Sequence, residues 1–354
     1  EGIDPLQVQQ APFFQHPIGC GPFMVEEVNM KNYTILAPFD KYYNGVADYK
    51  IQLLPSAGDS DPNVVTRAKS GNLDYGYTKM VADVQALEGT PGITVTPIDV
   101  RYTRLFYLNK FDKKDGSPAP LADVRVRQAL RYAIDMETIC ETLFQGSAVP
   151  ANALAPDANL KGGDLNDYNY NPEKAKELLA EANWDPNTVI KAVYYYTDQA
   201  TVDLMTAVQA YLADVGIKME FELVEGDLAT ILWAAPADQT NGPRAVDWDI
   251  CYAANAALSL HEYYDRYRTG SPTNSHTPED AELNRLIDAT NASADVNAQN
   301  EAFKELIKYE NENLFTMALY YQPIFLITSD KIGDIQKGTP QFCINWDIQN
   351  WNVQ

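Results

Sequence analysis

The sequence predicts an α/β protein, and three observations lead to that prediction. Short β-rich runs alternate with helical patterns along most of the 354 residues. Hydrophobic residues make up 45% and aromatic residues 11% of the chain, which is enough to build a folded core. The length suits two domains, at roughly 150 residues for each. We therefore expect two α/β lobes.

Strands and helices alternate in the first hundred residues. Gly71 and Gly89 each stand where a helical pattern stops, as glycine often does just after a helix. The alternation predicts an α/β layer fold. The expected strands are 32–38, 49–55, 72–78 and two runs within 92–109, and the expected helices are 62–71 and 79–89.

The second part of the chain is richer in helices but still alternates with strands. Asp123 is placed to cap one helix, and Asn171 with Pro172 to start another. We expect helices at 123–135, 136–145, 172–183, 199–215, 262–268, 278–292 and 295–311. The expected strands are 188–197, 217–224, 247–253 and one long buried strand at 315–328.

Composition excludes several classes of partner. The formal net charge is -22, which argues against nucleic acids and anionic membranes. No apolar run reaches the roughly 18 residues of a membrane span. With three histidines and four widely spaced cysteines, we expect no metal site, no cofactor and mostly buried free thiols.

Three arginines lie within seven residues of the stretch 125–131, and clustered arginine often binds anions. At helical spacing, however, Val124, Ala129, Leu130 and other apolar residues form one face, and Arg127 and Arg131 lie one turn apart on the other side. We interpret these two arginines as a solvated or ion-paired helix face.

The motif search favours a protein without catalytic chemistry. No GxSxG, HExxH, GxxxxGK[ST] or GxGxxG sequence occurs. The alternative is a secreted glycan-acting hydrolase that uses a carboxylate pair, such as Glu26 and Glu27 or Asp247 and Asp249, beside tyrosines. Twenty-two tyrosines provide flat amphipathic side chains, and those at strand ends could line a ligand cleft.

Six motifs resemble one family in its own motif order, over residues 16 to 185. They read "HPIGCGPFMVEEV", "DKYYNG", "AKSGNLDYGY", "LFYLN", "DVRVRQALRYAID" and "YNPEKAKELLAEANW". They are similar to signatures of the family 5 extracellular solute-binding proteins, which are the oligopeptide, dipeptide and nickel receptors of ABC importers. One departure is Asn183, which stands where glycine is usual.

The resemblance implies a fold of the periplasmic-binding-protein type II kind, with two α/β lobes around a hinge that close on ligand. The first lobe would comprise residues 1–104 and 325–354, the second 105–324, and the arginine-rich helix would belong to the second lobe's scaffold. Family members carry a segment before the first of these motifs that this chain lacks, so we expect an incomplete first lobe.

The resemblance also implies a non-catalytic receptor that delivers a peptide-like or other small polar solute to the membrane subunits of an ABC permease. Its location would be extracytoplasmic, in the periplasm or as a cell-surface lipoprotein. We expect no signal segment within these residues, which begin with "EGIDPLQVQQ".

We expect ligand contacts beyond the carboxyl ends of strands, where ligands of α/β lobes bind. The predicted contacts are Tyr77, Thr78, Lys79, Tyr102, Arg104, and the loop from Ala253 through Ala254, Asn255 and Ala256 to His261.

One position in that loop bears on the choice of ligand. The resemblance implies that peptide-binding members place an Asp there, which pairs with the α-ammonium group of the peptide. Here Asn255 or Ala256 takes that position, unless the loop is shifted and Glu262 or Asp265 takes over. An amide accepts a hydrogen bond but cannot neutralise an ammonium group, so we expect zwitterionic dipeptides to bind poorly.

Overall fold

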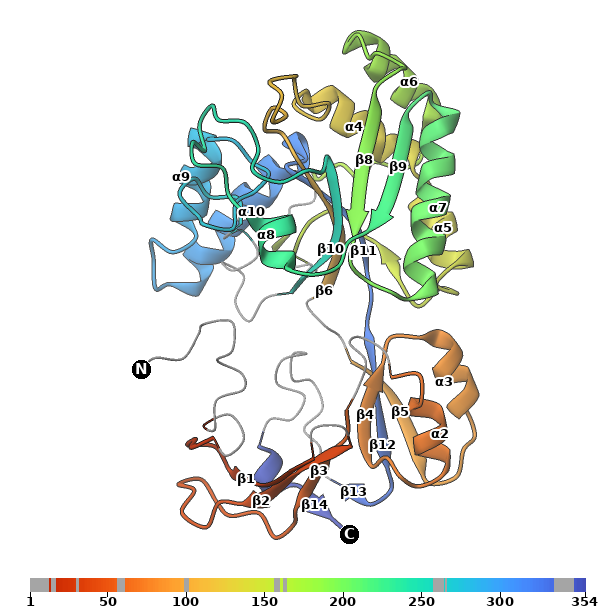
Figure 1. The fold of residues 1–354 in the computed structure, drawn as a ribbon, viewed down its shortest axis with the longest axis vertical. Coiled ribbons are helices and arrows are strands. Elements are labelled where there is room, and N and C mark those ends of the chain that lie inside the picture. The colour runs from red at the N-terminus through yellow and green to blue at the C-terminus, as the bar shows by residue number, and fades with distance from the viewer. Residues whose placement is uncertain are drawn as a thin grey trace. The chain divides into compact units, whose positions relative to one another are not determined.

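The computed structural model describes residues 13, 17–29, 32–55, 61–98, 102–155, 160–161, 164–256, 264, 266–333 and 347–354. The chain divides into two compact units, which Figure 1 traces by colour along the sequence. The smaller unit consists of Glu1–Val100 and Pro323–Gln354, and the larger unit consists of Arg101–Gln322.

A six-stranded sheet forms the centre of the larger unit, in the order β7-β11-β6-β10-β8-β9. Strand β8 runs parallel to both β9 and β10, while β6 is antiparallel to β10 and β11. The strands are β6 (Tyr102–Leu108), β7 (Val149–Pro150), β8 (Val189–Tyr194), β9 (Lys218–Leu223), β10 (Ile250–Ala256) and β11 (Thr316–Tyr321).

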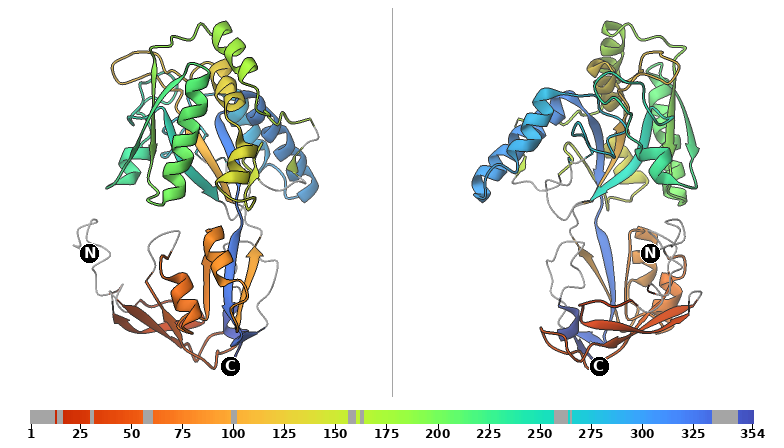
Figure 2. Two further views of the ribbon diagram at one scale, coloured as in Figure 1. Left: turned by 90° about the vertical axis from the view of Figure 1, so that its right-hand side faces the viewer. Right: turned by 60° about the vertical axis from the view of Figure 1, so that its left-hand side comes forward.

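Helices cover both faces of this sheet, as Figures 1 and 2 show. One face packs against α4 (Val124–Ala133), α5 (Met136–Thr142), α6 (Pro172–Glu181) and α7 (Gln199–Asp214). The other packs against α8 (Leu228–Trp233), α9 (Ala281–Ala289) and α10 (Val296–Asn313). Two separate apolar clusters result, one on each side of the strands, so the α/β prediction is confirmed.

The expected caps fix the helix starts. The Asp123 carboxylate accepts a hydrogen bond from the backbone N–H of Arg125, and the Asn171 side chain accepts one from Lys174, with Pro172 at the first position of α6. Asn183 ends that helix segment with φ of 53°, a left-handed conformation that asparagine tolerates better than most residues. This explains how asparagine can replace glycine there.

The smaller unit contains short strands and short helices. Its sheets are β1-β2-β3, β4-β12-β5 and β13-β14, all antiparallel. The strands are β1 (Phe23–Asn29), β2 (Tyr33–Pro38), β3 (Ile51–Leu53), β4 (Tyr75–Thr78), β5 (Ile93–Ile98), β12 (Ile324–Ser329), β13 (Ile332–Gly333) and β14 (Asn352–Val353). The helices are α2 (Val64–Lys69), α3 (Val81–Leu87) and the 3₁₀ helix η5 (Ile348–Asn350).

Some predicted elements differ from the structure. The single long strand expected at 315–328 is two strands, β11 and β12, that belong to different sheets. They are separated at Pro323, which cannot donate a backbone hydrogen bond to a sheet. Strand β1 and helix α8 were not expected. The helix expected at 262–268 lies partly outside the described residues, and Tyr267 within it is in a turn.

The interpretation of Arg127 and Arg131 as a solvated or ion-paired face is wrong. Both side chains are only 4% exposed. Arg127 donates to the carbonyl oxygens of Asn313 and Leu121, and Arg131 donates to that of Ala151. Buried guanidinium groups are tolerated here because backbone carbonyls replace the hydrogen bonds of water. The arginines are therefore scaffold.

Candidate functional site

An arginine and four tyrosines form a polar group in the larger unit, which we call the Arg–Tyr cluster. Tyr195 and Tyr196 directly follow β8, and their hydroxyl groups lie 3.0 Å apart. The Arg104 guanidinium carbon lies 4.5 Å from the centre of the Tyr196 ring. Tyr252 and Tyr320 complete the cluster, with their hydroxyl groups 2.7 Å apart. The residues of the cluster therefore come from β6, β10, β11 and the end of β8.

Strand register explains why these residues meet. Arg104 on β6 lies opposite Ala254 on β10 and opposite Tyr320 on β11. The Tyr196 hydroxyl accepts a hydrogen bond of 3.1 Å from the backbone N–H of Ala254, which ties the end of β8 to β10. Strands β8 and β10 are parallel, so the cluster lies at the carboxyl end of a parallel pair. Such ends are the usual ligand-binding edge of α/β sheets.

The tyrosines of the cluster are neutral. Burial raises the pKa of Tyr195, Tyr196 and Tyr252 above the usual range, and it raises the pKa of Tyr320 to about 12. The charge of Arg104 opposes the shift at each of them without reversing it. The cluster therefore offers one fixed positive charge and several hydroxyl groups that both donate and accept hydrogen bonds. Tyr252, Tyr320 and Arg104 are buried, whereas Tyr195 and Tyr196 are half-buried, so this pair is the part of the cluster that a polar solute can reach first.

Two of the segments predicted to contact ligand are neighbours in the structure. Tyr102 pairs with Ala256 and Arg104 with Ala254, in the antiparallel ladder of β6 and β10. Ala253 is fully buried in an apolar cluster, whereas Ala254 and Asn255 are partly exposed. His261, the last predicted contact of the loop, lies outside the described residues.

The other predicted contacts lie in the smaller unit. Tyr77 and Thr78 are on β4, and Lys79 follows directly. Tyr77 is 40% exposed, while Thr78 and Lys79 are buried. The Thr78 hydroxyl donates a hydrogen bond of 2.6 Å to Asp83 on α3. Thr78 therefore has a structural partner within its own unit.

Sequence reasoning left four tyrosines out of the predicted site: Tyr195, Tyr196, Tyr252 and Tyr320. A usable signal did exist, because Tyr195 and Tyr196 fall within the last three residues of the strand predicted at 188–197 and so stand at its carboxyl end. The proximity of Tyr252 and Tyr320 to Arg104 depends on the pairing of β6 with β10 and β11. Those pairings join residues far apart in the sequence.

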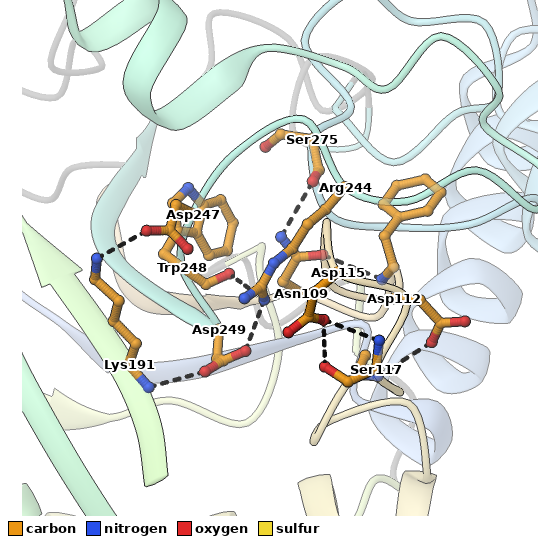
Figure 3. A network of polar contacts seen from close by, with 12 residues as sticks. Asn109, Asp112, Asp115, Ser117, Lys191, Arg244, Asp247, Trp248, Asp249 and Ser275 are labelled. Atoms are coloured by element: carbon orange, nitrogen blue, oxygen red, sulfur yellow. Dashed lines mark hydrogen bonds and ion pairs between the residues drawn. The ribbon is translucent and has the colours of Figure 1, made fainter.

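The acidic pairs of the hydrolase alternative have structural partners. Figure 3 shows Asp249 between Arg244 and Lys191. Asp249 forms a buried ion pair of 2.6 Å with Arg244 and accepts the backbone N–H of Lys191 at 2.9 Å, while Asp247 forms an ion pair of 3.1 Å with the Lys191 ammonium group. These contacts explain both carboxylates as parts of the fold.

The second acidic pair lies on β1 of the smaller unit. Glu26 forms an ion pair of 2.7 Å with Lys50, and Glu27 accepts a hydrogen bond of 2.8 Å from the Tyr33 hydroxyl. Each carboxylate thus has its own partner on a neighbouring segment. These contacts give no support to a hydrolytic pair.

A separate pocket in the larger unit has a volume of about 380 Å³. Two of its polar side chains bond to the surrounding protein: Arg131 donates to the Ala151 carbonyl, and Asn152 donates to Asp167 at 2.6 Å. It is lined by Arg131, Asp135, Met136, Glu137, Pro150, Ala151, Asn152, Lys161, Asp167, Tyr168, Asn169 and Tyr170. We place the candidate site at the Arg–Tyr cluster because that cluster stands at the carboxyl ends of strands.

Two further findings concern the residues that the structure describes. In that part of the chain, no three His, Cys, Asp or Glu side chains are grouped so that they could hold a metal ion. No helix there is long and apolar enough to cross a membrane.

Comparison with known proteins places the fold and the motifs in one family. The sequence model of the bacterial extracellular solute-binding proteins, family 5 Middle, matches residues 4–277. A Brucella ovis protein named as an ABC transporter peptide-binding protein is 29% identical over 208 residues, which is 57% of this chain and 38% of that protein. The oligopeptide-binding protein AppA of Bacillus subtilis is 27% identical over 274 residues, 71% of this chain and 46% of that protein.

The structural comparison agrees. Lactococcal OppA, solved with an endogenous peptide in the closed conformation, superposes with a TM-score of 0.81 at 17% identity, over 99% of this chain and 68% of that one. This likeness shows a shared fold of the type II periplasmic-binding-protein kind. The chain spans less than half the length of the two curated relatives above. With three quarters of its residues matched by the family model, the chain belongs to the bacterial extracellular solute-binding proteins of family 5.

Proposed function

We propose that this chain is the ligand-binding part of an extracytoplasmic receptor that captures a small polar solute and delivers it to the membrane subunits of an ABC importer. Family membership supports this proposal, as do the names of the curated relatives, which bind peptides for ABC transporters. The proposed location is the periplasm or the cell surface, and the proposed mode of action is binding without turnover.

The Arg–Tyr cluster is the observation that carries this proposal. It combines one guanidinium group with neutral hydroxyl groups at the carboxyl end of β8 and β10. We propose that the ligand contacts Arg104, Tyr195 and Tyr196, together with Asn255. From the smaller unit, Tyr77, Thr78 and Lys79 stay predicted ligand contacts.

The proposal predicts loss of binding when the cluster is altered. Peptides of two to five residues and neutral sugars are titrated into the protein by calorimetry, with mass spectrometry of the mixtures to detect products. We expect a ligand whose affinity falls about tenfold or more in Arg104→Gln and less in Tyr196→Phe, because each change removes donors from the cluster. Arg125→Gln is the matched control, since Arg125 pairs with Asp123 on the surface of the same unit.

Two outcomes would contradict the proposal. Products that form from any of these compounds would indicate an enzyme. Equal loss of affinity in the Arg125 control would show that the Arg–Tyr cluster is not the binding site.

The amine end of the ligand gives a second test. No Asp occupies the expected anchor position, so we propose that an α-ammonium group finds no counter-charge at Asn255. An N-acetylated dipeptide should then bind at least as well as the same dipeptide with a free amine. Calorimetry would reject this preference if the free-amine form bound about tenfold tighter.

A further inference from the structure

The hydroxyl groups of Tyr196 and Tyr195 form a short chain of hydrogen bonds at the end of β8. The backbone N–H of Ala254 can only donate, so the Tyr196 oxygen accepts its hydrogen bond of 3.1 Å. The Tyr195 hydroxyl lies 3.0 Å from that of Tyr196. Tyr195 packs against the apolar cluster on one face of the sheet and Tyr196 against the cluster on the other face. Both rings are therefore held in place.

The direction of the second hydrogen bond follows from the first. Tyr196 has one O–H proton, and among the described residues the Tyr195 oxygen is the acceptor within its reach. If Tyr195 donated instead, the Tyr196 proton would have no acceptor in that part of the chain. Burial raises the pKa of Tyr196, since its hydroxyl is largely removed from water, and an unpaired donor in such a position is costly. The bond therefore runs from Tyr196 to Tyr195.

This direction leaves Tyr195 with one unused group. Its oxygen accepts from Tyr196, whereas its own O–H proton has no acceptor among the residues that the structure describes. Tyr195 is half-buried, so a solute can reach it. A hydroxyl that accepts a hydrogen bond becomes a stronger donor, so the chain from Ala254 through Tyr196 strengthens Tyr195. At this point the candidate site offers a donor whose oxygen is already engaged.

Two positive charges favour the same kind of ligand atom. Burial raises the pKa of Tyr195, and the hydrogen bond with Tyr196 and the charges of Arg104 and Arg266 act against that shift. The Arg104 guanidinium carbon lies 4.5 Å from the centre of the Tyr196 ring. Positive charge near the hydroxyl repels the positive end of a ligand N–H or ammonium group and attracts an oxygen acceptor.

We propose that the ligand places an uncharged carbonyl oxygen on the Tyr195 hydroxyl, which donates a hydrogen bond to it. This inference rests on the proposed function and specifies the ligand class: a solute with an amide, ester or ketone carbonyl, rather than one that offers only hydroxyl or amino groups. A carbonyl oxygen accepts without a proton of its own to place, so it matches this contact. Tyr196 is then a positioning residue that keeps Tyr195 in its donating orientation.

The test replaces one ligand oxygen at a time. N-acetyl peptide amides of two to five residues are titrated into the protein by calorimetry, and each carbonyl oxygen of the tightest binder is then replaced by sulfur. A thioamide is the weaker acceptor, so we expect one replacement to weaken binding about threefold or more, as the loss of one hydrogen bond implies. Methyl glycosides have no carbonyl group and should bind about tenfold or more weaker than that peptide amide.

The variants identify the donor. Tyr195→Phe should weaken the parent amide by about three- to tenfold and abolish the difference between it and the sensitive thioamide, because only the hydroxyl is lost. Tyr196→Phe frees the Tyr195 oxygen to accept, so the advantage of the peptide amide over methyl glycosides should shrink although Tyr195 is intact. Tyr170→Phe removes the hydroxyl of a 43% exposed tyrosine of the same unit and should change none of these affinities.

The outcomes separate this inference from the proposed function. If Tyr195→Phe weakens the parent amide and every thioamide by the same factor, or weakens none of them, donation by Tyr195 to a carbonyl oxygen is wrong while the receptor function stands. The same holds if methyl glycosides bind as tightly as the peptide amides, or if peptides bind only with free charged ends. If no peptide and no sugar binds, the proposed function fails and this inference fails with it.

Thermal unfolding of Tyr195→Phe, compared with that of Tyr170→Phe, shows whether a loss of affinity is a loss of fold. If Tyr195→Phe is unstable, the thioamide series on the wild type and on Tyr196→Phe still decides. Equal binding of the parent amide and all its thioamides to the wild type would overturn the inference.

Discussion

Glu310 is a buried acid on α10, and its burial disfavours the charged carboxylate. The Thr316 hydroxyl donates a hydrogen bond of 3.1 Å to its carboxyl group, yet burial raises the pKa of Glu310 to about 7. Lys110, also buried, acts against that shift and donates to the carbonyl oxygens of Leu108 and Phe315. Burial lowers the pKa of Lys110 well below its usual range. This polar group inside the larger unit should therefore respond to pH near neutrality.

The first prediction is that the contribution of Glu310 to the free energy of unfolding falls as pH rises from about 5 to 8. Between the ordinary carboxyl pKa and about 7, the folded state keeps a proton at Glu310 that the unfolded state has lost, so stability decreases as pH rises. Glu310→Gln is uncharged throughout and should be more stable than the wild type at pH 8 by roughly 1 to 3 kcal/mol, and similar near pH 5. Urea denaturation at each pH measures this difference. Glu312→Gln, an exposed neighbour, is the control, and parallel pH profiles for Glu310→Gln and wild type would contradict the prediction.

At the scale of single elements, helix α7 begins next to the Arg–Tyr cluster. Asp198 caps it: its carboxylate accepts the backbone N–H of Thr201 at 2.9 Å and the Thr201 hydroxyl at 3.0 Å. Tyr196 stands two residues before this cap, so the start of α7 and the end of β8 are fixed by one short segment. The cap therefore also limits how far the Tyr196 ring can move.

The second prediction concerns this cap. Asp198→Ala should lower the free energy of unfolding by about 1 kcal/mol, whereas Asp198→Ser, which can still cap, should lose less. Asp203→Ala, which removes an exposed acid from the same helix, is the comparison and should cost only a few tenths of a kcal/mol. Chemical denaturation measures all three. A loss in Asp203→Ala as large as that in Asp198→Ala would show that the cap is not the cause.

The elements that the sequence predicts well are those with local signals. Asp123 and Asn171 are helix caps and are visible in the sequence, and α4 and α6 start where they predict. The break at Pro323 also has a local signal, but the continuous apolar run around it favoured one strand. Burial of Arg127 depends on carbonyl groups at Leu121 and Asn313, and the second of these comes from a distant helix.

The residues of the candidate site divide in the same way, into those with a local sequence signal and those that depend on contacts between distant segments. Arg104 was predicted from the rule that ligands of α/β lobes bind beyond the carboxyl ends of strands, and the ladder between β6 and β10 places it opposite Ala254. The contact between Arg104 and Tyr196 depends on which strands are neighbours, and local pattern does not determine that order.

At the scale of the whole molecule, the two units differ in the size of their cores. The larger unit has two extensive clusters of buried apolar residues, one on each face of its sheet. Among the described residues, the cluster of the smaller unit consists of Val64, Ala68, Leu87 and Ile327. Because burial of apolar surface is the main favourable term in folding, the smaller unit should be the less stable one.

The third prediction is that thermal unfolding has two transitions, the first from the smaller unit. Leu87→Ala should lower the midpoint temperature of only the first transition, and Leu212→Ala, on the buried face of α7, should lower that of only the second. Each change should cost about 2 to 5 kcal/mol in its own unit. Differential scanning calorimetry of the 354-residue chain resolves the two transitions. A single transition that both substitutions shift would show that the units unfold together.

Strand β6, which carries Arg104 of the candidate site, should open only rarely. Its residues from Thr103 to Leu108 are at most 7% exposed, and it is hydrogen bonded to β10 on one side and β11 on the other. Amide protons in such a strand exchange with deuterium only when the sheet itself opens. Their exchange rate should therefore report the global stability of the larger unit. Protection gained on ligand binding should appear instead in the segment around Tyr195 and Tyr196.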